Sequence, residues 1–315
     1  MTTPSRHYLA AALCAALALG AAGALATAPA AAPAGAAFTT LHTVVLSAQE
    51  VSGVKMQELS GLGWDADEEL LYAVSDRGSV FHLQLELGAA RIEKLVPVWA
   101  VALRDPRNAS RKFNAEGLSL VNAKNGVKGD TQLIVALEDG PSVLRFTPRG
   151  EAVADVELPP ALRDPKSYRK SKRLEAVSAH PEHGFVMAPE VALRSEPANT
   201  HTLHATGGGT WSFTALHEGS NVKAIETLPD GTLLVLERLE AGRAPTAGLR
   251  HIDPASCGAE RTCATGDAPA GNAGLAEGNF EGMAGVSGGL FLLVTDGGID
   301  KQGAAGFALV RLGTK

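Results

Sequence analysis

The chain has 315 residues, of which 45% are hydrophobic and 20% are charged, and its formal net charge is −6 at pH 7. This length is sufficient for one large domain with a continuous core. The mildly negative charge argues against a general nucleic-acid-binding protein, which would carry a strongly basic surface.

The first 26 residues have the pattern of a secretory signal peptide. Arg6 and His7 precede an Ala- and Leu-rich apolar run from Tyr8 to about Leu25, and small residues then offer a cleavage site. The alternative is a transmembrane anchor, but the run leads into an Ala/Pro-rich segment, residues 27–37, that is typical of an unstructured tether. No later span is long and apolar enough to cross a bilayer. We therefore expect a periplasmic or secreted protein, without a stable membrane span once the signal is removed, whose folded domain covers residues 38–315.

Five short segments recur along this domain, and each is followed by an apolar run that ends in a carboxylate. The segments are residues 58–62, 114–118, 173–177, 221–225 and 279–283, and their third positions are 56, 59, 48 and 58 residues apart. The apolar runs are residues 70–76, 133–138, 184–190, 233–237 and 290–296. Their Leu and Val content favours buried strands over helices. A repeat of this length built from short strands indicates a β-propeller.

Each of the first three units contains four expected strands, which is the content of one propeller blade. These strands cover residues 59–64, 70–75, 80–85 and 92–98, then 116–121, 131–138, 142–147 and 152–158, then 174–179, 184–190, 200–205 and 211–217. The fifth unit supplies only residues 281–286, 289–295 and 307–312. We expect residues 43–48 to add its missing outer strand, because closing the ring in this way removes an exposed sheet edge.

The predicted fold is therefore all-β: a single propeller of four-stranded blades, closed by an N-terminal strand. Five blades are favoured, and a sixth is possible if residues 254–278 form a degenerate blade. That segment also contains Cys257 and Cys263. Export to an oxidising compartment favours a local disulfide between them. A zinc site is the weaker alternative, because two thiolates without further Cys or His nearby supply only half of the ligands.

Propeller geometry brings the five segment starts together. Each blade begins with its innermost strand at one face of the ring, and the second strand returns to that face. We therefore expect two circles of side chains around the central channel. The first circle is Ser60, Glu116, Glu175, Lys223 and Glu281, and the second is Asp76, Glu138, Glu190, Glu237 and Asp296. Most of these positions are carboxylates, and like charges at close range cannot all remain ionised and unpaired.

Three arrangements could accommodate so many carboxylates. Oxygen ligands without thiols suit a hard cation, Ca²⁺ first and Mg²⁺ second, which makes all eight carboxylates of the two circles candidate metal ligands. Salt bridges to cations in the same segments are the second arrangement. In the third, each carboxylate only caps backbone amides of a neighbouring blade. Capping is the simpler explanation for one acid alone, but ligand or metal binding is favoured for the ring as a whole, because repeated burial of unpaired charge is costly.

At these residues the chain resembles the phytase-like family described as having esterase-like activity of phytase. The matching stretches are residues 59–62 with 72–77, 116–118, 233–238, and 279–284 with 292–296. The third unit departs from the family pattern at Ala176, and the fourth departs at Lys223 and Ala224, so equal participation of all blades does not follow. The resemblance implies a propeller and a phosphoesterase role.

For an enzyme, the expected reaction is metal-assisted hydrolysis of a small-molecule phosphate ester, in which Ca²⁺ bridges the phosphate and activates a water. The candidate catalytic residues are Glu116, Glu175, Glu281 and Asp296. The candidate phosphate-binding residues are Arg77, Arg173, Lys223 and Arg238, of which the arginines suit phosphate by their fork of donors. We expect a monomer.

Two other functions fit the same pattern. A calcium-dependent lactonase-type hydrolase also places a few acids around a central ion, although a neutral substrate would leave the basic residues without a purpose. A non-catalytic periplasmic binding or scaffolding propeller has the same fold, and fold alone does not distinguish it from an enzyme. Serine-hydrolase chemistry has little support, because the Gly-x-Ser-x-Gly spacing at residues 285–289 lies between two expected strands and not in the strand-to-helix elbow that this chemistry needs.

Overall fold

The computed structural model describes residues 38–169, 173–239, 246–258, 260–263, 278–296 and 305–312. The expected signal peptide (1–26) and tether (27–37) lie outside these residues. Within the described part of the chain, no helix has the length and apolar character needed to cross a bilayer.

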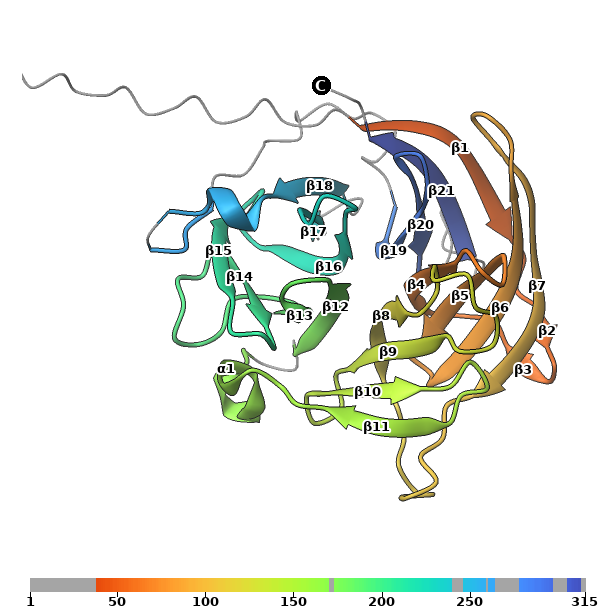
Figure 1. Cartoon of the computed structure of the whole chain (residues 1–315), viewed down its shortest axis with the longest axis horizontal. Coiled ribbons are helices and arrows are strands. Elements are labelled where there is room, and N and C mark those ends of the chain that lie inside the picture. The colour runs from red at the N-terminus through yellow and green to blue at the C-terminus, as the bar shows by residue number, and fades with distance from the viewer. Residues whose placement is uncertain are drawn as a thin grey trace, which may run out of the picture. The chain divides into compact units, whose positions relative to one another are not determined.

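The described residues form five antiparallel sheets arranged as a β-propeller (Figure 1). Blade 1 contains β4 (Leu59–Asp65), β5 (Leu70–Ser75), β6 (Ser79–Leu87) and β7 (Ile92–Ala102). Blade 2 contains β8 (Ala115–Val121), β9 (Gln132–Leu137), β10 (Ser142–Phe146) and β11 (Ala152–Val156). Blade 3 contains β12 (Leu174–His180), β13 (Gly184–Pro189), β14 (Thr200–Ala205) and β15 (Thr210–Thr214). Blade 4 contains β16 (Ser220–Thr227), β17 (Leu233–Leu239) and β18 (Thr246–Ile252). Blade 5 contains β19 (Phe280–Ser287), β20 (Leu290–Thr295), β21 (Ala305–Leu312) and β1 (Phe38–Leu46).

Few described elements lie outside the blades. They are the hairpin of β2 (Glu50–Val51) and β3 (Val54–Lys55), the short helix α1 (Pro160–Arg163), and two 3-10 turns, Pro165–Ser167 and Pro254–Ser256. The prediction of an all-β propeller with five blades is confirmed.

The ring is closed by contacts between inner strands and by the N-terminal strand. β4 contacts β8, β8 contacts β12, β12 contacts β16, β16 contacts β19, and β19 returns to β4. β1 pairs antiparallel with β21, from Phe38 opposite Leu312 to Leu46 opposite Ala305 (Figure 1). The expected closing strand is therefore present, although it begins at Phe38 and not at residue 43. Phe38 is buried against blade 5, which explains the extension.

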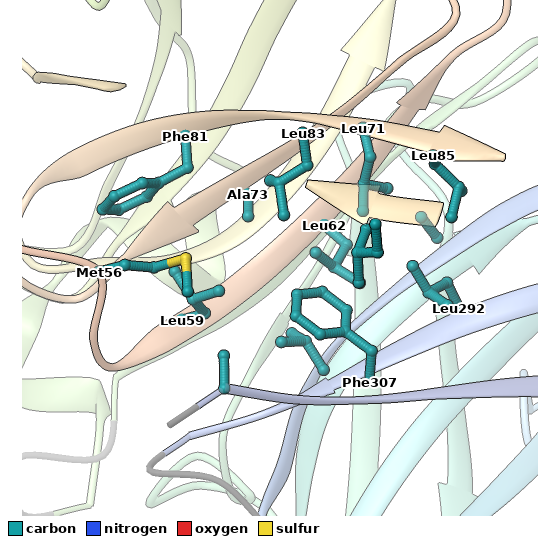
Figure 2. Close-up of a cluster of buried hydrophobic side chains, with 14 of the residues drawn as sticks. Met56, Leu59, Leu62, Leu71, Ala73, Phe81, Leu83, Leu85, Leu292 and Phe307 are labelled. Atoms are coloured by element: carbon teal, nitrogen blue, oxygen red, sulfur yellow. The ribbon is translucent and has the colours of Figure 1, made fainter. Parts of the chain in front are cut away.

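An apolar seam joins the first blade to the last (Figure 2). Leu62, Leu71 and Phe81 of blade 1 pack in one cluster with Leu292 and Phe307 of blade 5. Full burial of one such side chain contributes roughly 1.5–3 kcal/mol. This seam therefore stabilises the junction at which the two ends of the repeat array meet.

The cysteine segment follows blade 4 in the sequence but lies along blade 3. The backbone N–H of Cys263 donates to the Ser212 carbonyl at 2.8 Å, and the N–H of Ser212 donates to the Arg261 carbonyl at 2.9 Å. The segment thereby covers the outer edge of β15, where unpaired backbone groups would otherwise be exposed. Cys257 and Cys263 form a disulfide, which confirms the predicted pairing.

Candidate functional site at the mouth of the ring

Every inner strand has a register shift at the same place in the repeat. In the pairing of β4 with β5, the shift between Leu59 and Gly61 leaves Ser60 without a partner. The residues left out in the other four blades are Glu116, Glu175, Lys223 and Glu281. A β-bulge removes one residue from the ladder and re-aims its side chain. We call these five residues the bulge ring, and the end of the propeller at which they lie the mouth.

The residue after each bulge is Gly or Ala because neighbouring inner strands approach one another closely. A Cβ atom on Gly117 would lie 2.5 Å from the Glu175 carbonyl oxygen, and one on Gly282 would lie 2.8 Å from the Ser60 carbonyl oxygen. On the axis the strands leave a cavity of about 10 Å³, about the room of one water molecule. The central channel is therefore nearly closed directly below the mouth.

The ammonium group of Lys223 lies among three carboxylates. Its Nζ atom is 2.5 Å from Glu175 Oε1, 3.0 Å from Glu190 Oε1 and 3.1 Å from Glu281 Oε2, and the Arg238 guanidinium pairs with Glu281 from the other side. Burial alone would lower the pKa of Lys223, but these carboxylates raise it overall. Lys223 is thus a protonated internal counter-ion at the centre of the mouth.

Two of the ring carboxyl groups have pKa values raised well above that of a free glutamate. Burial raises the pKa of Glu116 to about 9, and the charge of Glu175 adds to this effect. Burial also raises the pKa of Glu175 to about 8, although Lys223 acts in the opposite direction. Four carboxyl groups, those of Glu116, Glu175, Glu190 and Glu281, lie around the two cations Lys223 and Arg238, so the raised pKa values of Glu116 and Glu175 reduce the excess of negative charge.

The expected second circle lies beside the bulge ring in four blades. The backbone N–H groups of Asp76, Glu138, Glu190 and Asp296 donate to carbonyls at the starts of the inner strands, at 2.8–3.1 Å. Burial and the nearby Glu58 raise the pKa of Asp76 to about 7. The pKa of Asp296 is raised by burial and by Glu281, and that of Glu138 is raised by burial. In these four blades, the start of the first strand and the end of the second strand therefore meet, as predicted.

Glu237 does not join this circle. It pairs with Val222 in the ladder, and the register position of Asp76 is taken in blade 4 by Arg238, opposite Asn221. A displacement of one residue turns a strand side chain to the opposite face. The Glu237 carboxylate instead accepts hydrogen bonds from Ser220 Oγ at 2.6 Å and from the Leu216 backbone at 2.7 Å. Burial would raise its pKa, but His201 and these donors lower it overall.

The four predicted basic residues all contact acids at the mouth. Lys223 and Arg238 belong to the central group. The Arg173 guanidinium donates to the Glu138 carbonyl at 3.2 Å, and the more exposed Arg77 donates to Glu58 at 2.7 Å. Lys223, Arg238 and Arg77 are therefore paired with carboxylates before any substrate arrives, whereas the Arg173 guanidinium bonds a backbone carbonyl.

Asparagines that the sequence-based site did not include orient several of the acids. Asn114 Nδ2 donates to Glu138 at 2.9 Å, Asn221 Nδ2 donates to Glu190 at 3.0 Å, and Asn279 Nδ2 donates to Glu281 at 3.1 Å. Each Asn lies two residues before a bulge-ring residue. The signal was visible in the sequence, because three of the five recurring segments begin with Asn.

The acids at the mouth do not form a preformed metal cage. Among the described residues, no three His, Cys, Asp or Glu side chains are grouped so that they could hold one metal ion. Lys223 already lies where three of the carboxylates converge. A calcium site needs six to eight oxygen ligands around one point, so the placement of these residues does not fit the expected ion, although their oxygen chemistry does.

Comparison with known proteins gives one family match. Residues 54–297 match the model of the Phytase-like family, described as "Esterase-like activity of phytase". No curated protein sequence is significantly similar to the chain.

Solved propellers are similar only at low identity. A catalytically inactive virginiamycin B lyase from Staphylococcus aureus, solved with quinupristin, has a TM-score of 0.38 and 10% identity over 81% of this chain, which spans 66% of that protein. A streptogramin B lyase has the same TM-score and identity, over 88% of each chain. The Dos1 propeller has a TM-score of 0.34 and 10% identity, over 82% of this chain and 68% of its own. Similarity at this level supports no inference about activity.

Proposed function

The chain belongs to the Phytase-like family, and from this premise we propose that it is a hydrolase that cleaves a small-molecule phosphate ester at the mouth. The observation that carries the proposal is the family match over residues 54–297, which includes all five bulge-ring positions. We also propose that it works as a monomer in the periplasm or outside the cell.

Glu116 is the proposed proton donor. Its carboxyl group is half-buried, and its pKa of about 9 keeps it protonated at pH 7. A neutral carboxylic acid in a partly dry site can give its proton to the leaving oxygen of an ester, as a general acid does. Asp296, at the rim beside Glu281, is the proposed group that orients the attacking water.

The cations at the mouth would bind the phosphate oxygens. Lys223 and Arg238 lie at the centre, and Arg173 and Arg77 lie farther out beside Glu138 and Glu58. Guanidinium groups present paired donors that match phosphate oxygens. Calcium, with magnesium as the second choice, stays a prediction that rests on the oxygen chemistry of the acids and not on their placement.

A non-catalytic binding or scaffolding role is the second candidate. It is favoured by the internal neutralisation of the mouth, in which Lys223 and Arg238 already pair with Glu175, Glu190 and Glu281. Such a ring is electrostatically complete without a ligand. It could therefore serve only to hold the five blades in register.

Hydrolysis of a panel of substrates by the purified protein separates these functions. The panel contains p-nitrophenyl phosphate, phytate, p-nitrophenyl acetate and a γ-lactone, each with added Ca²⁺ and with excess EDTA. The proposal predicts turnover of the phosphate esters, and the calcium prediction requires that EDTA abolish it. Turnover of the lactone alone would favour the lactonase-type reaction, and binding of phosphate esters without turnover would favour the binding propeller.

A further inference from the structure

A second cavity lies at the opposite end of the inner strands from the mouth. It has a volume of about 930 Å³, and its lining includes the far ends of β4, β16 and β19, at Trp64, Glu226 and Gly285. Gly285 lies four positions after Glu281 along β19, a distance of roughly 13 Å in a strand. The volume is in the range of cavities that hold small organic ligands. The cavity is thus separate from the mouth and independent of the proposed function.

The walls of this cavity are mainly apolar. Trp64, Leu290 and Phe291 line it together with Leu85, which also belongs to the seam shown in Figure 2. Phe291 and Leu85 are buried, whereas Trp64 and Leu290 are partly exposed. An apolar or aromatic group would therefore replace water against these side chains with a gain in free energy.

A single carboxyl group lies at the inner end of the cavity. Glu226 projects from β16 toward β19, and a Cβ atom added to Gly285 would lie 3.0 Å from Glu226 Oε1 and 3.4 Å from the Phe291 ring. Glycine at position 285 thus leaves room where the carboxyl group and the aromatic ring meet. Burial raises the pKa of Glu226 to about 8, as expected for an acid that is not paired with a cation.

The charges around the cavity favour a cationic ligand. Its charged lining residues are Glu226, Glu69 and Asp230 against the one base Lys124. An anion would face this excess of acids, while an ammonium group would displace the proton of the partly buried Glu226 and pair with its carboxylate. A salt bridge in such a partly dry place is stronger than one in water.

We propose that this cavity binds a small amphiphilic amine, with its apolar body against Trp64, Leu290 and Phe291 and its ammonium group on the Glu226 carboxylate. The class of ligand is set by the combination of apolar walls with one partly buried acid. Neutral molecules of the same shape would lose the charge pairing, and carboxylates would be repelled.

Binding of three fluorescent probes to the purified protein tests this site. The probes are dansylcadaverine, which carries a primary amine, N-butyl dansylamide, which is its neutral counterpart, and a dansyl amino acid, which carries a carboxylate. We expect the amine to bind at least 10-fold more tightly than the neutral probe, and the carboxylate to bind most weakly. Equal affinity for the amine and the neutral probe, or no binding of the amine, would overturn the proposal.

Two substitutions locate the binding. Glu226→Gln keeps the size of the side chain and removes its ability to ionise, so dansylcadaverine should bind about 10-fold more weakly while the affinity of the neutral probe changes less than twofold. Gly285→Ala narrows the inner end of the cavity and should weaken binding of the amine as well. The matched control is Glu86→Gln on an exposed surface position, which should leave all three affinities as they are. Unchanged affinity of the amine for Glu226→Gln, with the fold intact by circular dichroism, would show that the amine binds elsewhere.

Discussion

Lys223 takes the position that is a glutamate in blades 2, 3 and 5. Its Nζ atom contacts three acids, two from blade 3 and one from blade 5, so this side chain of blade 4 joins blades 3, 4 and 5 electrostatically. From the sequence, Lys223 is a departure from the repeat and a predicted phosphate ligand. Its role as an internal counter-ion could not be predicted, because that role depends on which acids turn toward it.

Replacing Lys223 with Met should destabilise the fold strongly. The substitution keeps an apolar stem of similar length but leaves Glu175, Glu190 and Glu281 without their common cation, and removing one partner of a buried ion pair costs about 3–5 kcal/mol. The measurement is the free energy of unfolding in urea. Lys94→Met removes the exposed partner of Glu86 and should cost at most about 1 kcal/mol. Equal effects of the two substitutions would contradict the central position of Lys223.

The raised pKa of Glu116 predicts how stability changes with pH. Folding raises this pKa from its ordinary value of 4.5 to about 9, so the folded protein holds the proton more tightly than the unfolded chain. The stabilisation is complete below pH 4.5 and is lost as the pH rises through 9. Glu116→Gln cannot ionise, so its melting temperature should fall less between pH 5 and pH 9 than that of the unmodified protein.

Melting curves at pH 5, 7 and 9 check this prediction. Between pH 5 and pH 9, we expect the melting temperature of the Gln variant to fall by at least about 2–4 °C less than that of the unmodified protein. This is the shift that 1 kcal/mol produces in a domain of this size. Parallel pH profiles for the two proteins would show that Glu116 titrates normally.

At the scale of the strand, the repeated bulge explains the repeated sequence. The expected bounds of β5 and β14 match the structure, because each is a short run between clear turn residues. The bulges could not be predicted, since a register shift depends on the partner strand. The same limit explains why the prediction for Glu237 was wrong. The apolar run ends near residue 237, but only the strand pairing shows that Arg238, and not Glu237, takes the position at the mouth.

Gly117→Ala tests the close approach of the inner strands. The added Cβ atom would overlap the Glu175 carbonyl oxygen at 2.5 Å, and overpacking of this kind costs typically about 1–3 kcal/mol. Gly258→Ala makes the same chemical change where the nearest atom lies 3.9 Å away, so it is the matched control. Urea unfolding should show a clear decrease in the free energy of unfolding for Gly117→Ala and almost none for Gly258→Ala. No loss at Gly117 would mean that blades 2 and 3 are spaced more widely than described.

At the scale of the whole molecule, the propeller is held together by β1 and by the seam between blades 1 and 5. This closure was predictable, because a fifth unit with three strands leaves a gap that an N-terminal strand fills. The placement of the cysteine segment along blade 3 could not be predicted, because the segment follows blade 4 in the sequence. Only the backbone hydrogen bonds of Arg261 and Cys263 with Ser212 assign it to blade 3.

Removal of β1 should open the ring. Deleting residues 38–46 removes the outer strand of blade 5 and exposes the edge of β21, which is a template for pairing with other chains. We expect the truncated protein to aggregate, as measured by light scattering during size-exclusion chromatography. A monomeric truncated protein with an unchanged melting temperature would show that β1 does not contribute to closure.

The rate of phosphate release from p-nitrophenyl phosphate by Glu116→Gln, compared with the unmodified protein, tests most directly whether the mouth is the site of hydrolysis. Loss of a general acid lowers kcat by about 100-fold or more, and we predict this loss with the fold intact by circular dichroism. Glu86→Gln, on the exposed surface, should retain the full rate. Equal rates for Glu116→Gln and the unmodified protein would contradict the role of Glu116 and the assignment of catalysis to the bulge ring.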